Sequence, residues 1–176
     1  MLATAYNDLL QRRDSLMAAA ETDSLTGLPN RYSFEQYTQG LGEEAFPLAL
    51  VLFDVNYLKH TNDTYGHSAG DELLRRAAGC ISDCFGATGE NRCFRFGGDE
   101  FAAVVTSASP ELMDRMEIRF LEEQRNRGLS IAWGYAISDA PSETSFRKLS
   151  EQADRHMYDR KKEMHWNESP EDQTQS

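Results

Sequence analysis

Runs of apolar residues, separated by polar and charged stretches, predict a series of helices and strands along the chain. Residues 48–53 are continuously apolar, which predicts a strand covered on both faces. Residues 93–96 and 101–105 predict two further strands joined by a tight hairpin turn, and a fourth strand is expected over residues 129–138. Apolar residues at helical spacing predict helices over residues 1–22, 32–41, 71–85, 110–125 and 145–162.

This alternation of helices and strands predicts an α/β (α+β) fold with a central mixed β-sheet flanked by helices. The length of 176 residues suits one domain with a substantial core, which we expect over residues 23–166. Residues 1–22 are expected to form an N-terminal signalling-type helix or linker to an upstream domain, pairing with a second copy. The alternative, that this helix packs on its own domain, stays open. Residues 167–176 are polar and are expected to form a disordered tail.

The composition excludes some classes of partner. The formal net charge is −11, which argues against a nucleic-acid or anionic-membrane partner, since both favour a basic surface. It does not exclude a nucleotide, because a metal ion can bridge carboxylates to phosphates. Cys80, Cys84 and Cys93 lack metal-binding spacing, which favours reduced thiols and a cytoplasmic location. No apolar run approaches the length of a membrane span and no signal peptide is expected, so we predict no membrane insertion by this segment.

Three acidic residues are candidates for a metal site. Asp54 ends the predicted buried strand, and Asp99 and Glu100 lie at the hairpin tip. If the strands are neighbours, these carboxylates can share one or two Mg²⁺ ions, with Mn²⁺ as the alternative. The adjacent Gly97 and Gly98 suit positive-φ turn conformations and would leave room for a ligand near the backbone. The competing reading is that Asp54 caps the following segment and that the hairpin is a solvated turn.

The segment after Asp54 carries candidate nucleotide-binding groups. Its backbone amides can cradle phosphates, and Lys59 adds a positive charge. Asp71 can accept two hydrogen bonds from the N1–H and N2–H₂ edge of guanine, while Asn62 can pair with the remaining acceptors. Asp71 is also a plausible helix N-cap and Asn62 a turn residue, and His67 is interpreted as structural.

Three stretches together resemble the GGDEF family of diguanylate cyclases. They are residues 23–31, residues 54–71, and Arg95-Phe96-Gly97-Gly98-Asp99-Glu100-Phe101. The resemblance implies a palm-like nucleotidyl cyclase fold and an enzyme of bacterial second-messenger signalling that condenses two GTP into cyclic di-GMP and two pyrophosphates. It also implies a homodimer in which each subunit binds one GTP, together with an upstream sensory domain in the full-length protein.

The resemblance implies roles for individual residues. Asp54, the Val55 carbonyl, Asp99 and Glu100 would hold the metal, and Asp99, Glu100 and Lys59 would act in catalysis. The nucleotide would be bound by Asn62 and Asp71 at the guanine, and at the phosphates by the amides of Tyr57 and Leu58 and by Lys59 and Lys161, with Gly97 and Gly98 leaving room.

Three positions depart from the family pattern. Residues 88–91 read Thr-Gly-Glu-Asn where many members carry an Arg-x-x-Asp product-inhibition site, so we expect no feedback inhibition through that site. His165 stands where a phosphate-binding Arg is frequent, which predicts a weaker phosphate contact unless Arg160 or Lys162 substitutes. Asn56, where many members have Asp, is a milder change.

Two other functions remain as alternatives. The chain could be a catalytically weak or inactive module that binds GTP and regulates a neighbouring domain. It could also be another two-metal nucleotidyl transferase that extends a nucleic-acid primer, although the acidic charge counts against this reading.

Overall fold

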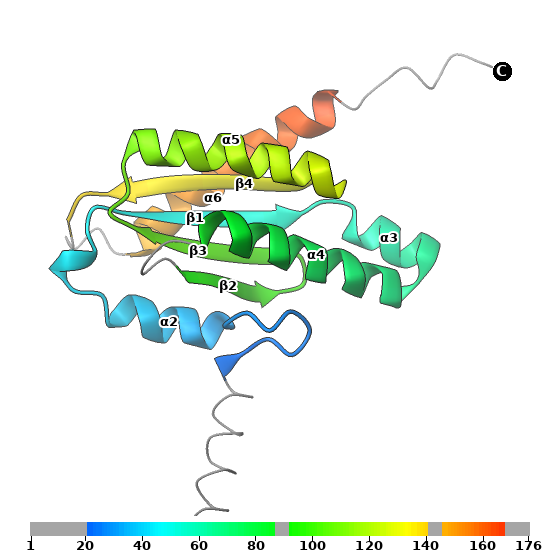
Figure 1. Cartoon of the computed structure of the whole chain (residues 1–176), viewed down its shortest axis with the longest axis horizontal. Coiled ribbons are helices and arrows are strands. Elements are labelled where there is room, and N and C mark those ends of the chain that lie inside the picture. The colour runs from blue at the N-terminus through cyan, green and yellow to red at the C-terminus, as the bar shows by residue number, and fades with distance from the viewer. Residues whose placement is uncertain (1–20, 87–91, 141–145, 168–176) are drawn as a thin grey trace, which may run out of the picture.

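The computed structural model of the chain describes residues 21–86, 92–140 and 146–167. Four strands and five α-helices are found in these residues, and all four predicted strands are present (Figure 1). In chain order the elements are α2 (Arg31–Gln39), a 3₁₀ turn (Glu43–Ala45), β1 (Leu48–Val55), α3 (Leu58–Tyr65), α4 (His67–Phe85), β2 (Arg92–Gly97), β3 (Glu100–Thr106), α5 (Pro110–Arg127), β4 (Ile131–Ser138) and α6 (Phe146–Asn167). The helix expected over residues 1–22 lies outside the described residues up to residue 20, and Thr22 forms an isolated bridge with Pro29. The tail expected over residues 167–176 also lies outside them, except for Asn167, which ends α6.

The four strands form one sheet in the order β2-β3-β1-β4. Every pairing between neighbouring strands is antiparallel, so the expectation of a mixed sheet was wrong. The crossover through α3 and α4 does join strands of the same direction, β1 and β2, and the crossover through α5 likewise joins β3 and β4. However, β3 lies between β1 and β2, and β1 lies between β3 and β4. All neighbouring strands are therefore antiparallel. A parallel contact occurs only as an isolated bridge between Asn30 and Arg95 among the described residues.

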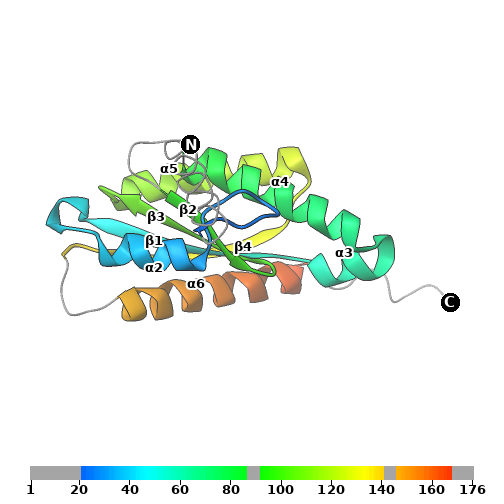
Figure 2. The same cartoon turned by 90° about the horizontal axis from the view of Figure 1, so that it is seen from below.

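Helices cover both faces of the sheet, with α4 and α5 on one face and α2 and α6 on the other (Figure 2). Alternate residues of β1 therefore enter two different cores, which explains its continuous apolar run. Val51 and Phe53 pack in the core beneath α4 and α5, where Phe53, Phe85 and Phe120 form edge-on ring contacts. Leu48 and Leu50 pack in the opposite core beneath α2 and α6.

Residues 58–65 form a helix, α3, where the sequence predicted only a polar stretch. The helix has no buried residue, so its sequence carries little apolar periodicity. Left-handed backbone at Tyr57 (φ +64°) and positive φ at Gly66 (+86°) bound it on either side. The next helix, α4, consequently begins at His67 rather than near residue 71.

Candidate functional site

The end of β1 brings Asp54 against the signature hairpin. Asp54 lies directly opposite Glu100 of β3, and the Val55 amide donates to the Asp99 carbonyl at 3.0 Å. Directly opposed residues of an antiparallel pair project from the same face of the sheet. The structure therefore places the Asp54 and Glu100 side chains on one face, as the metal-site prediction requires.

The two hairpin glycines both adopt positive φ, at +135° for Gly97 and +54° for Gly98. A side chain would strain the backbone at these positions. A Cβ added at either residue would meet no atom of the described chain within 4 Å. The space beside the hairpin backbone is thus open, which is compatible with the approach of a bulky ligand.

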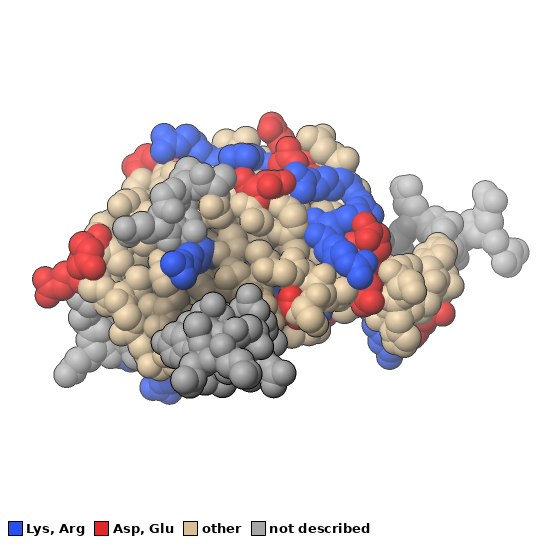
Figure 3. All heavy atoms as spheres, turned by 60° about the horizontal axis from the view of Figure 1, so that its bottom comes forward, with Lys and Arg blue, Asp and Glu red and all other residues tan. Residues whose placement is uncertain are grey.

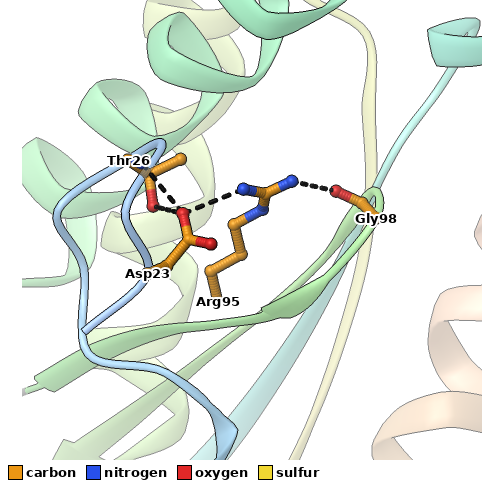
Figure 4. Close-up of polar contacts among 4 residues, drawn as sticks. All are labelled: Asp23, Thr26, Arg95 and Gly98. Atoms are coloured by element: carbon orange, nitrogen blue, oxygen red, sulfur yellow. Dashed lines mark hydrogen bonds and ion pairs between the residues drawn. The ribbon is translucent and has the colours of Figure 1, made fainter. Parts of the chain in front are cut away.

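A partly buried ion pair joins the hairpin to the turn that precedes α2 (Figure 4). Nη1 of Arg95 contacts Asp23 Oδ1 at 2.8 Å, and Nη2 donates to the Gly98 carbonyl at 2.7 Å. Thr26 donates to the same Asp23 oxygen through its amide at 2.9 Å and its hydroxyl at 2.6 Å. Burial raises the pKa of Asp23, but these hydrogen bonds outweigh it and hold the pKa below its ordinary value. The tip of the hairpin is therefore held by a side chain that the sequence prediction did not count as a site residue.

The predicted phosphate-binding groups lie at the start of α3. Tyr57 is the N-cap residue of that helix, and Leu58 and Lys59 form its first turn. Amides in the first turn of a helix have no partner within the helix and favour anions. Lys59 is exposed and extends from the same turn.

The predicted guanine-binding residues come from two helices in contact. Asn62 of α3 lies against the first turns of α4, so close that a Cβ on Gly70 would fall 1.9 Å from Asn62 Oδ1. Asp71 follows Gly70 directly, and both Asn62 and Asp71 are half-buried. The absence of a side chain at residue 70 is what allows Asn62 to approach the part of α4 that carries Asp71.

The C-terminal part of α6 brings Lys161 to the same end of the sheet. Lys161 Nζ donates to Asp54 Oδ1 at 2.7 Å, across more than one hundred residues of chain. The side chains of Lys161 and Asp54 are 34% and 17% exposed. The residue predicted to contact the terminal phosphates therefore contacts a predicted metal ligand.

The donor set at this site fits a hard divalent cation. Asp54 and Glu100 supply carboxylate oxygens from opposed positions, and the Asn56 side-chain oxygen, buried two residues beyond Asp54, accepts no hydrogen bond. The side chains described do not gather three His, Cys, Asp or Glu residues into one cluster. Asp99 contributes its backbone carbonyl to the hydrogen bond with Val55. The metal-ligand assignments thus stay predictions that the chemistry of the donors supports.

Two departures from the family pattern lie beyond the reach of the structure. Residues 88–91 and the side chain of His165 are outside the described part of the chain. Of the two proposed substitutes for His165, Arg160 is held by Glu117 at 2.9 Å, and Lys162 Nζ lies 4.1 Å from the centre of the Tyr158 ring.

On the face in view in Figure 3, Lys and Arg side chains gather along the upper edge and toward the right, with Asp and Glu side chains beside them. Arg127 contacts both Asp83 and Glu123, and Arg75 contacts Glu72. These pairs agree with the acidic net charge and give no support to a phosphate-tracking groove. Within the described ranges, no helix combines the length and the apolar character needed to cross a membrane.

Comparison with known proteins decides the family. The sequence model of the family described as "Diguanylate cyclase, GGDEF domain" matches residues 20–167. The chain belongs to the GGDEF domain family. The predicted α/β fold is confirmed by a crystal structure of the coiled coil and GGDEF domain of DgcB from Caulobacter crescentus in complex with c-di-GMP. That structure superposes with a TM-score of 0.77 at 24% identity, over 92% of each chain.

Other GGDEF relatives differ in their named activities. The diguanylate cyclase DgcM of Escherichia coli K12 is 36% identical over 111 residues, which are 60% of this chain and 27% of DgcM. The cyclic di-GMP phosphodiesterase PdeB of Shewanella oneidensis is 29% identical over 138 residues, 73% of this chain and 16% of PdeB. The chain thus matches only a minor part of the length of these two relatives.

Proposed function

We propose that this GGDEF domain is a diguanylate cyclase that condenses two GTP into cyclic di-GMP and two pyrophosphates. The observation that supports it most directly is the meeting of Asp54, Glu100 and Lys161 at one end of the sheet. Two carboxylates for a cation and one ammonium for phosphate are the charges that phosphoryl transfer uses. The 36% identity to a diguanylate cyclase supports the same reading.

Separate groups of residues would bind the guanine, the phosphates and the metal ion. Asn62 and Asp71 would bind the guanine, and the Tyr57 and Leu58 amides with Lys59 and Lys161 would orient the phosphates. Asp54, the Val55 carbonyl, Asp99 and Glu100 would hold Mg²⁺ or Mn²⁺. The bound cation would polarise the α-phosphate and neutralise charge on the departing pyrophosphate.

The reaction requires two copies of the domain, because each GTP supplies both an attacking 3′-hydroxyl and an attacked α-phosphorus. Each hydroxyl forms a bond to the α-phosphorus of the other nucleotide, loses its proton, and displaces one pyrophosphate. Glu100, exposed and directly opposite Asp54, is our candidate for receiving or directing that proton, with Asp99 next to it in the hairpin. Gly97 and Gly98 would allow the nucleotides to approach the hairpin backbone.

The proposed substrate suggests where the enzyme acts in the cell and how it is controlled. We propose a cytoplasmic location, where GTP is available, and a sensory domain upstream that governs the pairing of two copies. We further propose that residues 88–91 leave the enzyme without product inhibition of the Arg-x-x-Asp type. Turnover that falls steeply at low micromolar cyclic di-GMP, with product binding mapped to those residues, would overturn this part.

The second candidate function is a GTP-binding module that regulates a neighbour without turnover. It is kept because a phosphodiesterase, PdeB, contains a segment similar to this chain. GTP binding without product, persisting when dimers are enforced, would favour this candidate.

The test is incubation of the protein at high concentration with GTP and Mg²⁺, with products resolved by chromatography and mass. We expect cyclic di-GMP from the wild type and none from Asp99→Ala. A fused coiled coil that enforces dimers is the second arm, because it separates a missing partner from a missing activity. Absence of product in both arms would refute the cyclase proposal.

A further inference from the structure

The strand β4 lies at one edge of the sheet and is enclosed by helices from both sides. Gly134 faces α6, where a Cβ would fall 2.2 Å from the Met157 nitrogen and 2.5 Å from the Ala153 carbonyl oxygen. The neighbouring Trp133 belongs to the opposite core, where its ring contacts Phe120 of α5 at 5.9 Å between centroids. The helices α5 and α6 thus cover opposite faces of β4 at this edge.

Arg160 of α6 connects the two layers around this edge. Its guanidinium pairs with the Glu117 carboxylate of α5 through two nitrogen–oxygen contacts, Nη1–Oε1 at 2.9 Å and Nη2–Oε2 at 3.3 Å. The same guanidinium lies 4.1 Å from the centre of the Trp133 ring. We call Arg160, Glu117 and Trp133 the edge clamp. A planar guanidinium that is both paired at two points and stacked on a ring has a defined orientation.

The residue after Arg160 is Lys161. Successive residues of an α-helix point about 100° apart, so the rotation of α6 that directs Arg160 toward α5 directs Lys161 toward a different neighbour. That neighbour is Asp54 at the end of β1, at 2.7 Å. A small rotation or slide of the helix end would break both contacts together. One turn earlier, the His156 ring nitrogen contacts the Tyr135 carbonyl at 2.8 Å, which fixes α6 against β4.

We propose that Arg160 is a positioning residue, which through the edge clamp sets the rotation of α6 so that Lys161 faces the terminal phosphates of GTP. The proposal rests on the proposed function for the identity of the ligand. It also assigns Arg160 a role other than replacing the phosphate-binding Arg that is absent at residue 165.

The variants Arg160→Gln and Glu117→Gln test this, because Glu117 pairs with Arg160 and is not among the residues predicted to bind the nucleotide or the metal. The affinities for GTP, supplied as its 3′-deoxy analogue, which lacks the attacking hydroxyl and cannot react, and for GMP are measured by calorimetry with Mg²⁺ present. We expect GTP affinity to fall by about threefold to tenfold in either variant, the size of one charge-assisted or cation–π contact. GMP affinity should stay unchanged, because GMP has no terminal phosphates. Arg147→Ala is the matched control, since it removes an exposed α6 ion pair with Glu151 far from the edge clamp.

Exchanging the charges provides a rescue. The Arg160→Glu variant should lose GTP affinity, and adding Glu117→Arg should restore part of it. An equal loss of affinity for GTP and GMP would overturn the proposal, because it would indicate a general loss of structure. Unchanged GTP affinity in Arg160→Gln would also overturn it.

A readout without nucleotide separates this inference from the proposed function. A zero-length carbodiimide links an amine and a carboxylate in contact, so the yield of the Lys161–Asp54 link reports the placement of Lys161 directly. With chelator present, we expect the yield to fall in Arg160→Gln and to be retained in Arg147→Ala. If the cross-linking yield falls in Arg160→Gln but the wild type binds no GTP, the proposed ligand is refuted and the positioning by Arg160 is supported. An unchanged yield would refute the positioning.

Discussion

At the scale of single residues, the candidate site depends on a few polar side chains whose surroundings decide their roles. The half-buried Asp71 and the pair of half-buried Asp23 with buried Arg95 are two such cases. Asp71 is expected to bind the ligand, whereas the pair of Asp23 and Arg95 is expected to stabilise the fold. Their substitutions should therefore change different measurable quantities.

Asp71→Asn should lower the affinity for GTP by about tenfold or more, because an amide cannot accept both hydrogen bonds from the guanine edge. Inosine triphosphate lacks the guanine N2 amino group, so its binding should fall less. The measurement is the ratio of the two dissociation constants in the wild type and the variant. Asp63→Asn, on the exposed side of α3, is the matched control and should keep the wild-type ratio. A preserved ratio in Asp71→Asn would exclude this residue from guanine recognition.

Asp23→Asn should destabilise the fold by about 1–3 kcal/mol at pH 7, because Arg95 would lose its charged partner in a buried setting. The pKa of Asp23 is lowered in the folded protein from its ordinary 3.8, so the carboxylate stabilises the fold above that pH. This stabilisation is lost as the pH falls through the folded pKa.

The difference in unfolding free energy between wild type and Asp23→Asn should accordingly be greatest near neutrality and shrink in the acid range. Urea titrations at several pH values measure it. The exposed pair of Glu72 and Arg75 supplies the control, since Glu72→Gln should show little difference at any pH. A difference for Asp23→Asn that does not vary with pH would contradict the assigned role.

At the scale of elements, the sequence predicted most of the strands and helices and missed what depends on contacts between them. An apolar run predicted β1, because both faces of this strand are buried. Two shorter apolar runs around the glycine turn predicted the hairpin. They did not predict α3, whose residues are all partly or fully exposed. Nor could periodicity reveal Arg160 reaching around the sheet edge, since Glu117 lies more than forty residues away.

The close crossing of α6 over β4 leaves Gly134, among the described glycines, with the closest backbone atoms to an added Cβ. Gly134→Ala should destabilise the fold by about 2–3 kcal/mol, because the added methyl would collide with helix backbone rather than with a movable side chain. Thermal and urea unfolding measure the loss. Gly40→Ala is the control, since its Cβ would lie at an ordinary 3.6 Å from its neighbours. If Gly134→Ala were as stable as the wild type, α6 would have to pack less closely than described.

At the scale of the whole molecule, one domain holds only half of the reactants of the proposed reaction. The residues expected to bind one GTP could be proposed from the sequence, because Asp54, Asn62 and Asp99 lie in short motifs of fixed order. The arrangement of two domains could not be predicted, because motifs within one chain do not specify how two copies are oriented.

Specific activity should therefore rise with protein concentration, approaching a plateau as dimers form. Removal of residues 1–20 should lower turnover at equal concentration, and a fused dimeric coiled coil should restore it. Turnover measured over a hundredfold range of concentration checks this, with sedimentation to report the oligomeric state. Specific activity that is independent of both concentration and truncation would contradict dimer-dependent catalysis.

The place of β1 between β3 and β4 has a consequence for how the protein is made. β1 is synthesised early, yet its partners at Glu100 and Ala132 are synthesised much later. Until then an apolar strand has neither neighbour, and contacts so distant in sequence close slowly. Nascent chains should therefore be most prone to aggregate in this interval, and slower synthesis at low temperature should favour soluble product.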